Sequence, residues 1–238
     1  MAANTGDEPH IDLPSAFAML PFQMHMFTDL VSSAPDGLLV IGKATDDHSD
    51  RAILISSTGR AMGMDRVLLS LLSLYTDPKM LVLVINVNEQ DLGLLTEELG
   101  GFSAHHPPVA ITTEQSSTDR QDLYLRGGLF SFTADETCLP VNDANDRAAG
   151  VIFVTSRILA VDMLTQRIPM KKITGLVVAN AHKVTPLTPE AFILRLYRHE
   201  NREGFVKAVT DNAHGFVSEY NTVEKVRRSF LSVLAAVT

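Results

Sequence analysis

The sequence holds a single cysteine, Cys138, so no disulfide can form within the chain. Disulfides persist in oxidising compartments and are rare where thiols are kept reduced, so we expect a reducing compartment. The acidic neighbours Asp135 and Glu136 favour the neutral form of the Cys138 thiol. A reactive thiolate at this position is therefore not expected.

Long apolar runs are also lacking, and none approaches the roughly 20 residues that a membrane-spanning helix needs. Residues 1–9 are polar and acidic, without the basic flank and apolar centre of a signal peptide. The sequence predicts no contact with a membrane. Residues 1–14 are expected to be a disordered lead-in.

Positive charge is scarce in the first part of the chain, and the net charge of −8 is unevenly divided. Residues 1–150 hold 8 Lys and Arg against 21 Asp and Glu, whereas residues 151–238 hold 12 against 7, so a net −13 precedes a net +5. The basic part could face a polyanion such as DNA. A solvated helix face is the alternative.

Apolar periodicity predicts one α/β core in this 26.0 kDa chain. Short β-branched runs alternate with helical patterns, which is typical of a parallel sheet covered by helices. The expected strands are 38–41, 53–55, 80–87, 151–154, 176–179 and 206–209. The expected helices are 15–31 with a kink or late start at Pro21, 65–75, 91–99 stopped by Gly100-Gly101, one capped by Thr155-Ser156 and ended by Pro169, and one starting at 192–197. Residues 105–120 read as a flexible crossing, and 222–238 as the start of a helical region whose remainder is missing.

A phosphate-binding loop would lie where a strand precedes a helix, and two segments of the sequence come near the required pattern. Residues 37–44 nearly fit G-x4-G-K-[ST], but the middle residues form the strand, and Ala44 lacks the hydroxyl that binds magnesium. Residues 58–65, with Gly59 and Gly63, are better placed. There Asp65 replaces the Ser or Thr and would repel a phosphate.

The second half of an ATPase site needs acidic residues after a strand, to hold magnesium and to orient water. After the strand at 176–178 the chain offers Ala179-Asn180-Ala181-His182, which contains no acid. An active ATPase is therefore not expected, and His182 is expected to be a buried, hydrogen-bonded residue and neither an acid nor a base.

Several runs in the second half carry a family resemblance: Thr155-Ser-Arg-Ile-Leu, Val161-Asp162, Arg167-Ile-Pro, Ile173-Thr-Gly, Ala181-His182, Glu190-Ala-Phe-Ile-Leu-Arg-Leu, Gly204-Phe and Thr210-Asp-Asn-Ala. With them, the chain closely resembles the N-terminal helicase-like region of the XPF family, the catalytic subunits of a heterodimeric nucleotide-excision-repair endonuclease. Weaker similarity covers Asp36-Gly-Leu-Leu-Val-Ile, Asp65-Arg66, Leu81-Val-Leu-Val-Ile-Asn and Arg126-Gly-Gly.

The resemblance implies a RecA-like (P-loop NTPase-like) lobe of a superfamily 2 helicase over residues 15–221, with insertions near 42–58 and 131–149. Its degenerate nucleotide site would comprise Gly59, Gly63, Asp65, Asn180 and His182. The family's nuclease motif, G-D-x-x-x-E-R-K-x-x-x-D, and its helix-hairpin-helix modules do not occur in this sequence. No catalytic residue, metal ligand or cofactor is carried over to this sequence. The resemblance implies Mg²⁺ only for that nuclease domain.

The resemblance also implies contact with a DNA backbone. Thr155, Ser156 and Arg157 would lie at a helix start, where a hydroxyl, an arginine and a helix N-terminus suit phosphate. The alternative is that Ser156 only caps the helix and Arg157 is a surface charge. Further positive surface is expected from Lys171, Lys172, Arg195, Arg198, Arg202 and Lys207.

Three hypotheses follow for a nuclear protein of this family. The first is a non-catalytic module that helps a structure-specific endonuclease engage damaged DNA or single-strand/double-strand junctions. The second is a docking platform for repair and nuclease-scaffold proteins with little DNA affinity of its own. The third, an enzyme acting on nucleotides, is opposed by both failed motifs. The family's small non-catalytic heterodimer partner would bind through modules outside this sequence.

Overall fold

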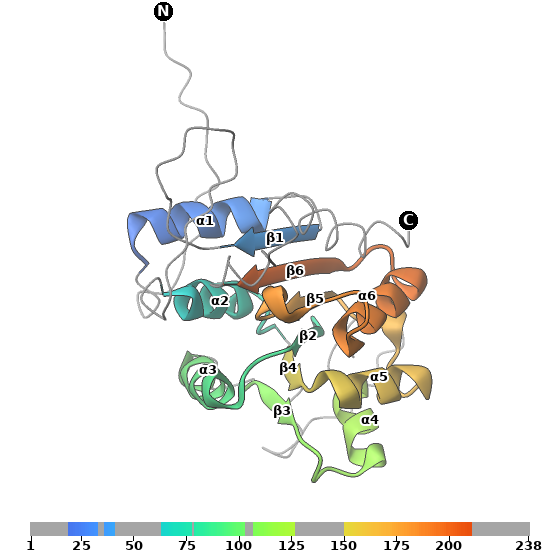
Figure 1. The fold of residues 1–238 in the computed structure, drawn as a ribbon. Coiled ribbons are helices and arrows are strands. Elements are labelled where there is room, and N and C mark those ends of the chain that lie inside the picture. Colours follow the sequence, from blue (N-terminus) through green and yellow to red (C-terminus); the bar gives the residue numbers. More distant parts are fainter. Residues whose placement is uncertain are drawn as a thin grey trace, which may run out of the picture.

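The computed structural model describes residues 19–32, 36–40, 63–77, 79–102, 107–126 and 150–210, and for 36–40 it describes the backbone. These residues form an alternating series of helices and strands (Figure 1). In chain order they are α1 (Pro21–Ser32), β1 (Asp36–Val40), α2 (Met64–Ser73), β2 (Val82–Ile85), α3 (Glu89–Phe102), β3 (Val109–Ile111), α4 (Ser117–Arg126), β4 (Val151–Val154), α5 (Ser156–Leu164), the 3-10 turn η4 (Met170–Lys172), β5 (Gly175–Val178), the 3-10 turn η5 (Ala181–Lys183), α6 (Pro189–Glu200) and β6 (Phe205–Thr210).

The strands pair into one sheet of order β1-β6-β5-β2-β4-β3, and every pair is parallel. The central strand β2 pairs with β5 from Val82 opposite Gly175 to Ile85 opposite Val178. Four consecutive residues are buried in each of β2, β4 and β5. Strands covered on both faces need such continuous apolar runs, which explains why these three stand out in the sequence.

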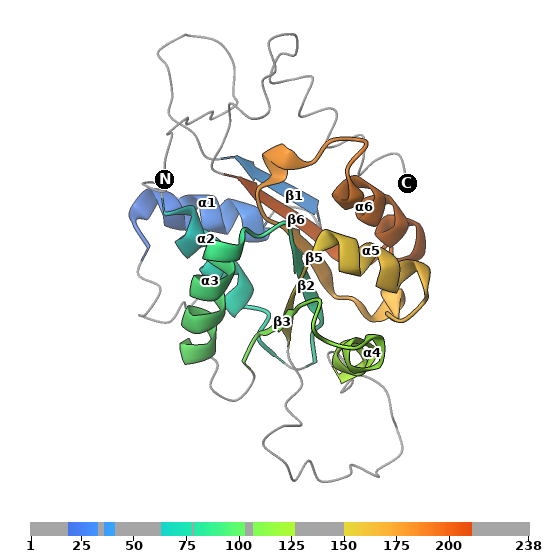
Figure 2. The same ribbon diagram turned by 60° about the horizontal axis from the view of Figure 1, so that its bottom comes forward.

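Helices cover both faces of the sheet, as Figure 2 shows: α1, α2 and α3 lie on one side, and α4, α5 and α6 on the other. Successive residues of β2 alternate between two hydrophobic clusters. Val82 and Val84 pack in the cluster that includes α1, α2 and α3, whereas Leu83 and Ile85 pack in the cluster that includes α4, α5 and α6. The α/β prediction of a parallel sheet with helices on both faces is confirmed.

The strand predictions at 151–154, 176–179 and 206–209 match β4, β5 and β6 to within one residue at each end. The predicted strands 38–41 and 80–87 contain or overlap β1 and β2. Helix α1 takes the late start, with Pro21 as its first residue, where a missing N–H costs nothing.

Two expectations about helix ends, and one about a loop, are wrong. Gly100 and Gly101 do not stop α3, which continues to Phe102. Neither glycine has the positive φ of a glycine C-cap. Among the described glycines, only Gly63 has a positive φ. Helix α5 ends at Leu164, one turn before Pro169, with Thr165 as its C-cap.

The supposed crossing at 105–120 instead contains the edge strand β3 and the first turn of α4. Strand β3 has only three residues, and α4 is polar apart from a few positions such as the fully buried Tyr124. Both elements are therefore too short or too polar for periodicity to reveal. Several expectations fall on residues that lie outside the described ranges. They concern 1–14, 42–58, 131–149 and 222–238, the strand at 53–55, Gly59 and Cys138.

Two close approaches fix the second half of the sheet. Gly204, just before β6, lies under Tyr197 of α6, where a Cβ atom would overlap the Tyr197 hydroxyl oxygen and lie 2.9 Å from the carbonyl oxygen of Ile173. On the other face of the sheet, the buried Lys207 of β6 donates from Nζ to the carbonyl oxygen of Leu30, at 2.8 Å, in the last turn of α1.

We expect Gly204→Ala to lower the free energy of unfolding of the 238-residue chain by about 1–3 kcal/mol, because the added methyl group must displace Tyr197 or the backbone of Ile173. The matched control is Gly93→Ala in α3, where no atom lies within 4 Å of the added Cβ. It should stabilise the helix by up to about 1 kcal/mol. Urea unfolding followed by circular dichroism measures both, and equal effects of the two substitutions would contradict the packing described.

Candidate nucleic-acid interface

Parallel pairing brings the carboxyl ends of the strands to one edge of the sheet, hereafter the carboxyl edge. The segments that leave β2, β4, β5 and β6 therefore lie next to one another, although they are far apart in the sequence. Ligand sites of open α/β sheets lie at this edge, where loops and helix N-termini converge. Five of the predicted site residues directly follow β4 or β5 and therefore lie at this edge: Thr155, Ser156, Arg157, Asn180 and His182.

Helix α5 begins at the carboxyl edge directly after β4. Thr155 is its exposed N-cap residue in extended conformation, and its carbonyl oxygen accepts from the N–H of Leu159 at 3.0 Å. Ser156 is only 9% exposed, and Arg157 is exposed. No side chain in the described part of the chain caps this helix, so Ser156 is not the cap that the alternative interpretation required.

The first turn of α5 is the electropositive one at this edge. Helices α3 and α6 carry acidic side chains in their first turns, Glu89 and Asp91 in α3 and Glu190 in α6. The first turn of α5 carries none, and it adds the charge of Arg157 to the partial positive charge of the helix N-terminus. An anion is therefore favoured at the start of α5 over the starts of its two neighbours.

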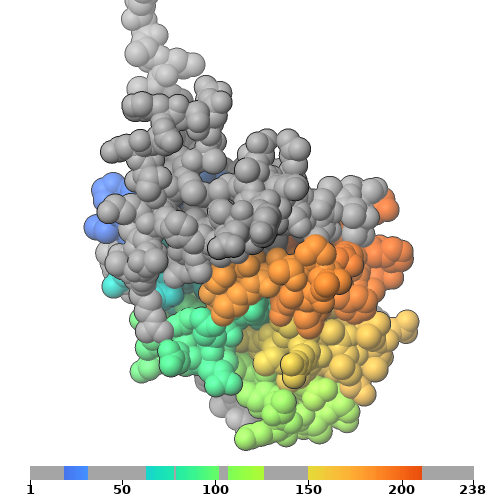
Figure 3. All heavy atoms as spheres, in the orientation of Figure 1, coloured from blue at the N-terminus to red at the C-terminus, as the bar shows by residue number. Residues whose placement is uncertain are grey.

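A groove of about 380 Å³ opens beside the start of α5. Its walls come from the ends of β2, β3 and β4 and from the first turns of α3, α5 and α6. The lining residues are Val84, Asn86, Val87, Leu92, Ile111, Phe153, Val154, Thr155, Ser156, Arg157, Pro189 and Glu190. In Figure 3 the green segment of α3, the yellow segment of α5 and the orange segment leading into α6 adjoin one another on the face shown.

Two asparagines hold the ends of β2 and β5 together at this edge. The Nδ2 amide of Asn86 donates to the carbonyl oxygens of Ala179 (2.9 Å) and Asn180 (3.0 Å), and Nδ2 of Asn180 donates to the carbonyl oxygen of Asn86 (3.0 Å). Both residues have positive φ, 62° and 49°, which asparagine tolerates better than most residues. The amide of Asn180, a predicted member of the degenerate nucleotide site, is thus bonded to the neighbouring strand.

The other predicted members of the nucleotide site are partly described. His182 is half-buried, and its Nδ1 lies 2.7 Å from Oγ1 of Thr210 at the end of β6. Gly63 precedes α2 with φ 63°, and Asp65 is exposed in the first turn of that helix. His182 is thus hydrogen-bonded, as predicted, though it is not fully buried.

One lysine at the carboxyl edge was missed by sequence reasoning. Nζ of Lys183 donates to Oδ1 of Asn88 at 2.8 Å, and Nδ2 of Asn88 donates to Oδ2 of Asp91 at 3.0 Å. Lys183 is exposed within η5, beside the strand that leads to His182. Its position directly after a predicted strand was the available signal, because a parallel sheet gathers such positions at one edge.

Three of the predicted basic residues lie away from α5. Lys171 and Lys172 are exposed in η4, just before β5, and Arg202 is exposed just before β6. Residues that precede a strand lie at the opposite, amino edge of a parallel sheet. A four-residue strand spans roughly 13 Å, so these side chains form a surface separate from Thr155, Ser156 and Arg157.

Two more of the predicted basic residues are buried, which makes the expectation that they line an exposed surface wrong. Arg198 is 5% exposed and donates from Nη1 to the carbonyl oxygen of Gly204, and Lys207 is 3% exposed on β6. Burial lowers the pKa of both side chains. Both serve packing within the fold. Arg195 is exposed on α6, and its Nη2 donates to the carbonyl oxygen of Pro186 at 2.7 Å.

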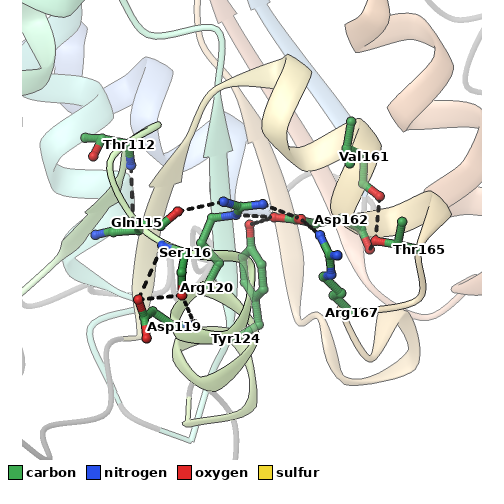
Figure 4. Close-up of polar contacts among 10 residues, drawn as sticks. All are labelled: Thr112, Gln115, Ser116, Asp119, Arg120, Tyr124, Val161, Asp162, Thr165 and Arg167. Atoms are coloured by element: carbon green, nitrogen blue, oxygen red, sulfur yellow. Dashed lines mark hydrogen bonds and ion pairs between the residues drawn. The ribbon is translucent and has the colours of Figure 1, made fainter.

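A buried carboxylate anchors α5 to its neighbours, as Figure 4 shows. Asp162 is fully buried and accepts two bonds from Arg120 of α4, Nε to Oδ2 at 2.9 Å and Nη2 to Oδ1 at 3.0 Å. Nη1 of Arg167 lies 3.3 Å from Oδ1, and the Tyr124 hydroxyl donates to Oδ2 at 3.2 Å.

The charges of this cluster stabilise one another. Hydrogen bonding to Asp162 raises the pKa of Arg120, and burial, with Asp162 adding to it, raises the pKa of Tyr124. Four hydrogen bonds from these side chains thus replace the water molecules that the carboxylate loses on burial. Helix α4 is thereby fixed to α5, whose first turn borders the groove.

The described residues contain no helix that combines the length and the apolar character needed to cross a membrane. Within the same ranges, no group of three His, Cys, Asp or Glu side chains lies close enough together to hold a metal ion.

The strand order and the covering helices define a RecA-like fold. The fold is similar to that of the helicase domain of Hef from Pyrococcus furiosus, with a TM-score of 0.56 and 16% identity, over 90% of this chain and 36% of that one. At that identity the similarity concerns the fold alone.

Proteins of similar sequence show the family to which the chain belongs. Over 71% of this chain's own length, the sequence is 38% identical to the DNA repair endonuclease XPF of Cricetulus griseus. Over 89% of this chain, it is 33% identical to the DNA repair endonuclease XPF of Drosophila melanogaster. It is 29% identical to the DNA repair protein rad16 of Schizosaccharomyces pombe over 88%. No protein-family model matches it. The chain belongs to the XPF family, and it spans 16–19% of the length of these relatives.

We expect Asp162→Ala to lower the free energy of unfolding by about 3–5 kcal/mol, because it leaves the charge of Arg120 largely buried without its carboxylate. Arg167→Ala should cost less than about 1 kcal/mol, since that side chain is 29% exposed and its bond is longer. Denaturant unfolding of both variants tests the ranking. A cost for Asp162→Ala no larger than that for Arg167→Ala would contradict the anchoring role.

Proposed function

We propose that this chain is a non-catalytic, helicase-like module through which a nuclear, structure-specific DNA repair endonuclease engages branched, crosslinked or damaged DNA during nucleotide-excision repair and related pathways. The start of α5 carries the proposal. There an uncapped helix N-terminus, the hydroxyl of Thr155 and the exposed Arg157 adjoin an open groove. Membership of a family of DNA repair endonucleases supports DNA as the anion that this surface binds.

The contact would be made with the sugar-phosphate backbone. Amide N–H groups at a helix start and an arginine both recognise phosphate oxygens, and such contacts carry no sequence information. Binding of this kind releases counterions, so the affinity should fall steeply as salt rises. Lys183, exposed at the same edge, is a further candidate for backbone contact.

We also propose that the nucleotide site is inactive. Ala179 and Asn180 stand where an ATPase needs magnesium-binding and water-orienting acids, and the Asn180 amide is bonded to the neighbouring strand. Asp65 in the first turn of α2 would repel a phosphate at that helix start. A magnesium-dependent reaction of the endonuclease would then take place in a separate nuclease domain.

A second function, docking of repair and nuclease-scaffold proteins, is favoured by a different surface. Val161 and Leu164 of α5 are 51% and 62% exposed, and Leu125 of α4 is 37% exposed, on the two helices that Asp162 ties together. Exposed apolar side chains gathered on packed helices are typical of protein contacts. This surface is separate from the first turn of α5, so the two functions can coexist. The small heterodimer partner of the family would bind elsewhere in a full-length protein.

The DNA proposal is tested by titrating the 238-residue chain with a forked DNA and with a duplex of equal length at two salt concentrations. We expect salt-sensitive binding that prefers the fork. Arg157→Ala should weaken it severalfold and reduce the salt slope by about 1, as the loss of one phosphate contact predicts.

Arg202→Ala is the matched control, because it removes an exposed arginine from the opposite edge of the sheet. It should leave fork binding nearly unchanged. Equal losses from the two variants would place the DNA outside the carboxyl edge. Absence of binding by a chain shown to be folded would favour the docking function.

The nucleotide proposal predicts that magnesium and ATP, added together at millimolar concentration, leave the melting temperature of the chain unchanged, because a ligand stabilises a protein only if it binds the folded state. Differential scanning fluorimetry measures this shift. A concentration-dependent rise in melting temperature would revive the hypothesis of a nucleotide-binding protein.

A further inference from the structure

The groove beside α5 has a chemical character that phosphate contacts alone do not use. Apolar side chains from three elements line it, among them Val87 after β2, Leu92 of α3 and Ile111 of β3. Arg157 stands on its α5 side and Glu190 on its α6 side. A ligand that fills the groove must therefore present an apolar body next to a negative charge.

We propose that the groove receives an unpaired base of single-stranded DNA while the adjoining phosphate lies against the start of α5. This inference rests on the proposed function and names the form of DNA that the site binds. A nucleotide of a single strand carries both required parts, a phosphate and a flat base with apolar faces. Single-strand binding proteins combine positive charge for the backbone with apolar or aromatic surfaces for the bases in the same way.

The charges on the two sides of the groove set the direction of the nucleotide. Glu190 repels a phosphate from the α6 side, whereas Arg157 and the uncapped first turn of α5 attract it to the other side. The base then extends from α5 toward α3 and α6, into the space that Leu92 borders. A carboxylate such as Glu190 can also accept a hydrogen bond from an exocyclic amine of a base.

Duplex DNA does not fit this arrangement. Its bases are paired and stacked, and bringing one into a side groove costs a few kcal/mol for unpairing and unstacking. A duplex can therefore bind only through its phosphates. The groove accordingly gives the module a preference for the single-stranded arms of a branched molecule over its double-stranded arms.

The decisive probe is a pair of fluorescently labelled single strands of equal length and charge, an oligothymidylate and an oligomer of abasic residues. With the 238-residue chain at one salt concentration, we expect the oligothymidylate to bind about tenfold more tightly. The salt slopes of the two should agree, because both present the same phosphates.

Leu92→Gln and Leu94→Gln provide matched variants on α3. Leu92 lines the groove, whereas Leu94 is 55% exposed and does not. Leu92→Gln should bring the ratio of the two affinities close to one while leaving abasic binding unchanged, and Leu94→Gln should keep the tenfold ratio. Thermal melts establish that both variants are folded.

Equal affinity for the two probes in the native chain would overturn the inference and leave the proposed function standing, since the DNA would then be held by phosphates alone and the groove would serve another occupant. An affinity ratio that Leu92→Gln does not change would overturn it as well. Absence of binding to both probes and to the fork would overturn the proposed function and this inference together.

Discussion

Every strand of the described sheet runs parallel to its neighbours, and the remaining features of the molecule depend on this constraint. Parallel strands must be joined by crossovers, which places helices on both faces and buries the central strands completely. The same constraint collects the chain segments that follow strands at one edge. A helix start, two asparagines, a histidine and an apolar groove therefore meet there without being close in sequence.

Charged residues in this fold divide into those that hold the core together and those that remain available to a ligand. Asp162 accepts hydrogen bonds from two arginines and a tyrosine and so fixes α4 against α5, and Lys207 joins β6 to the end of α1. Lys207 and Arg198 contribute to the basic excess of residues 151–238, but both are buried and present almost no charge to solvent. Arg157 and Lys183 are exposed, and both lie at the carboxyl edge. The net charge of a segment is thus a poor guide to the charge of its surface.

At the carboxyl edge, amide side chains join the ends of two central strands. Asn86 and Asn180 bond reciprocally across β2 and β5, and His182 is bonded to Thr210 of β6. The groove next to α5 remains open and shares Asn86 with this network. These bonds tie the ends of three neighbouring strands together beside the groove, which agrees with the fixed binding surface that the proposed function requires.

Local sequence patterns were enough to predict the α/β class, the central strands, the absence of acids after β5 and the family, because continuous apolar runs and short motifs are local properties. They did not reveal β3 and α4, whose three residues and polar surface carry little periodicity. Which basic residues reach solvent could be seen only in the folded chain, since the burial of Arg198 and Lys207 depends on Gly204 and α1, to which they bond. The structure also shows that Lys171 and Arg157 lie at opposite edges of one sheet, because Lys171 precedes a strand and Arg157 follows another strand parallel to it.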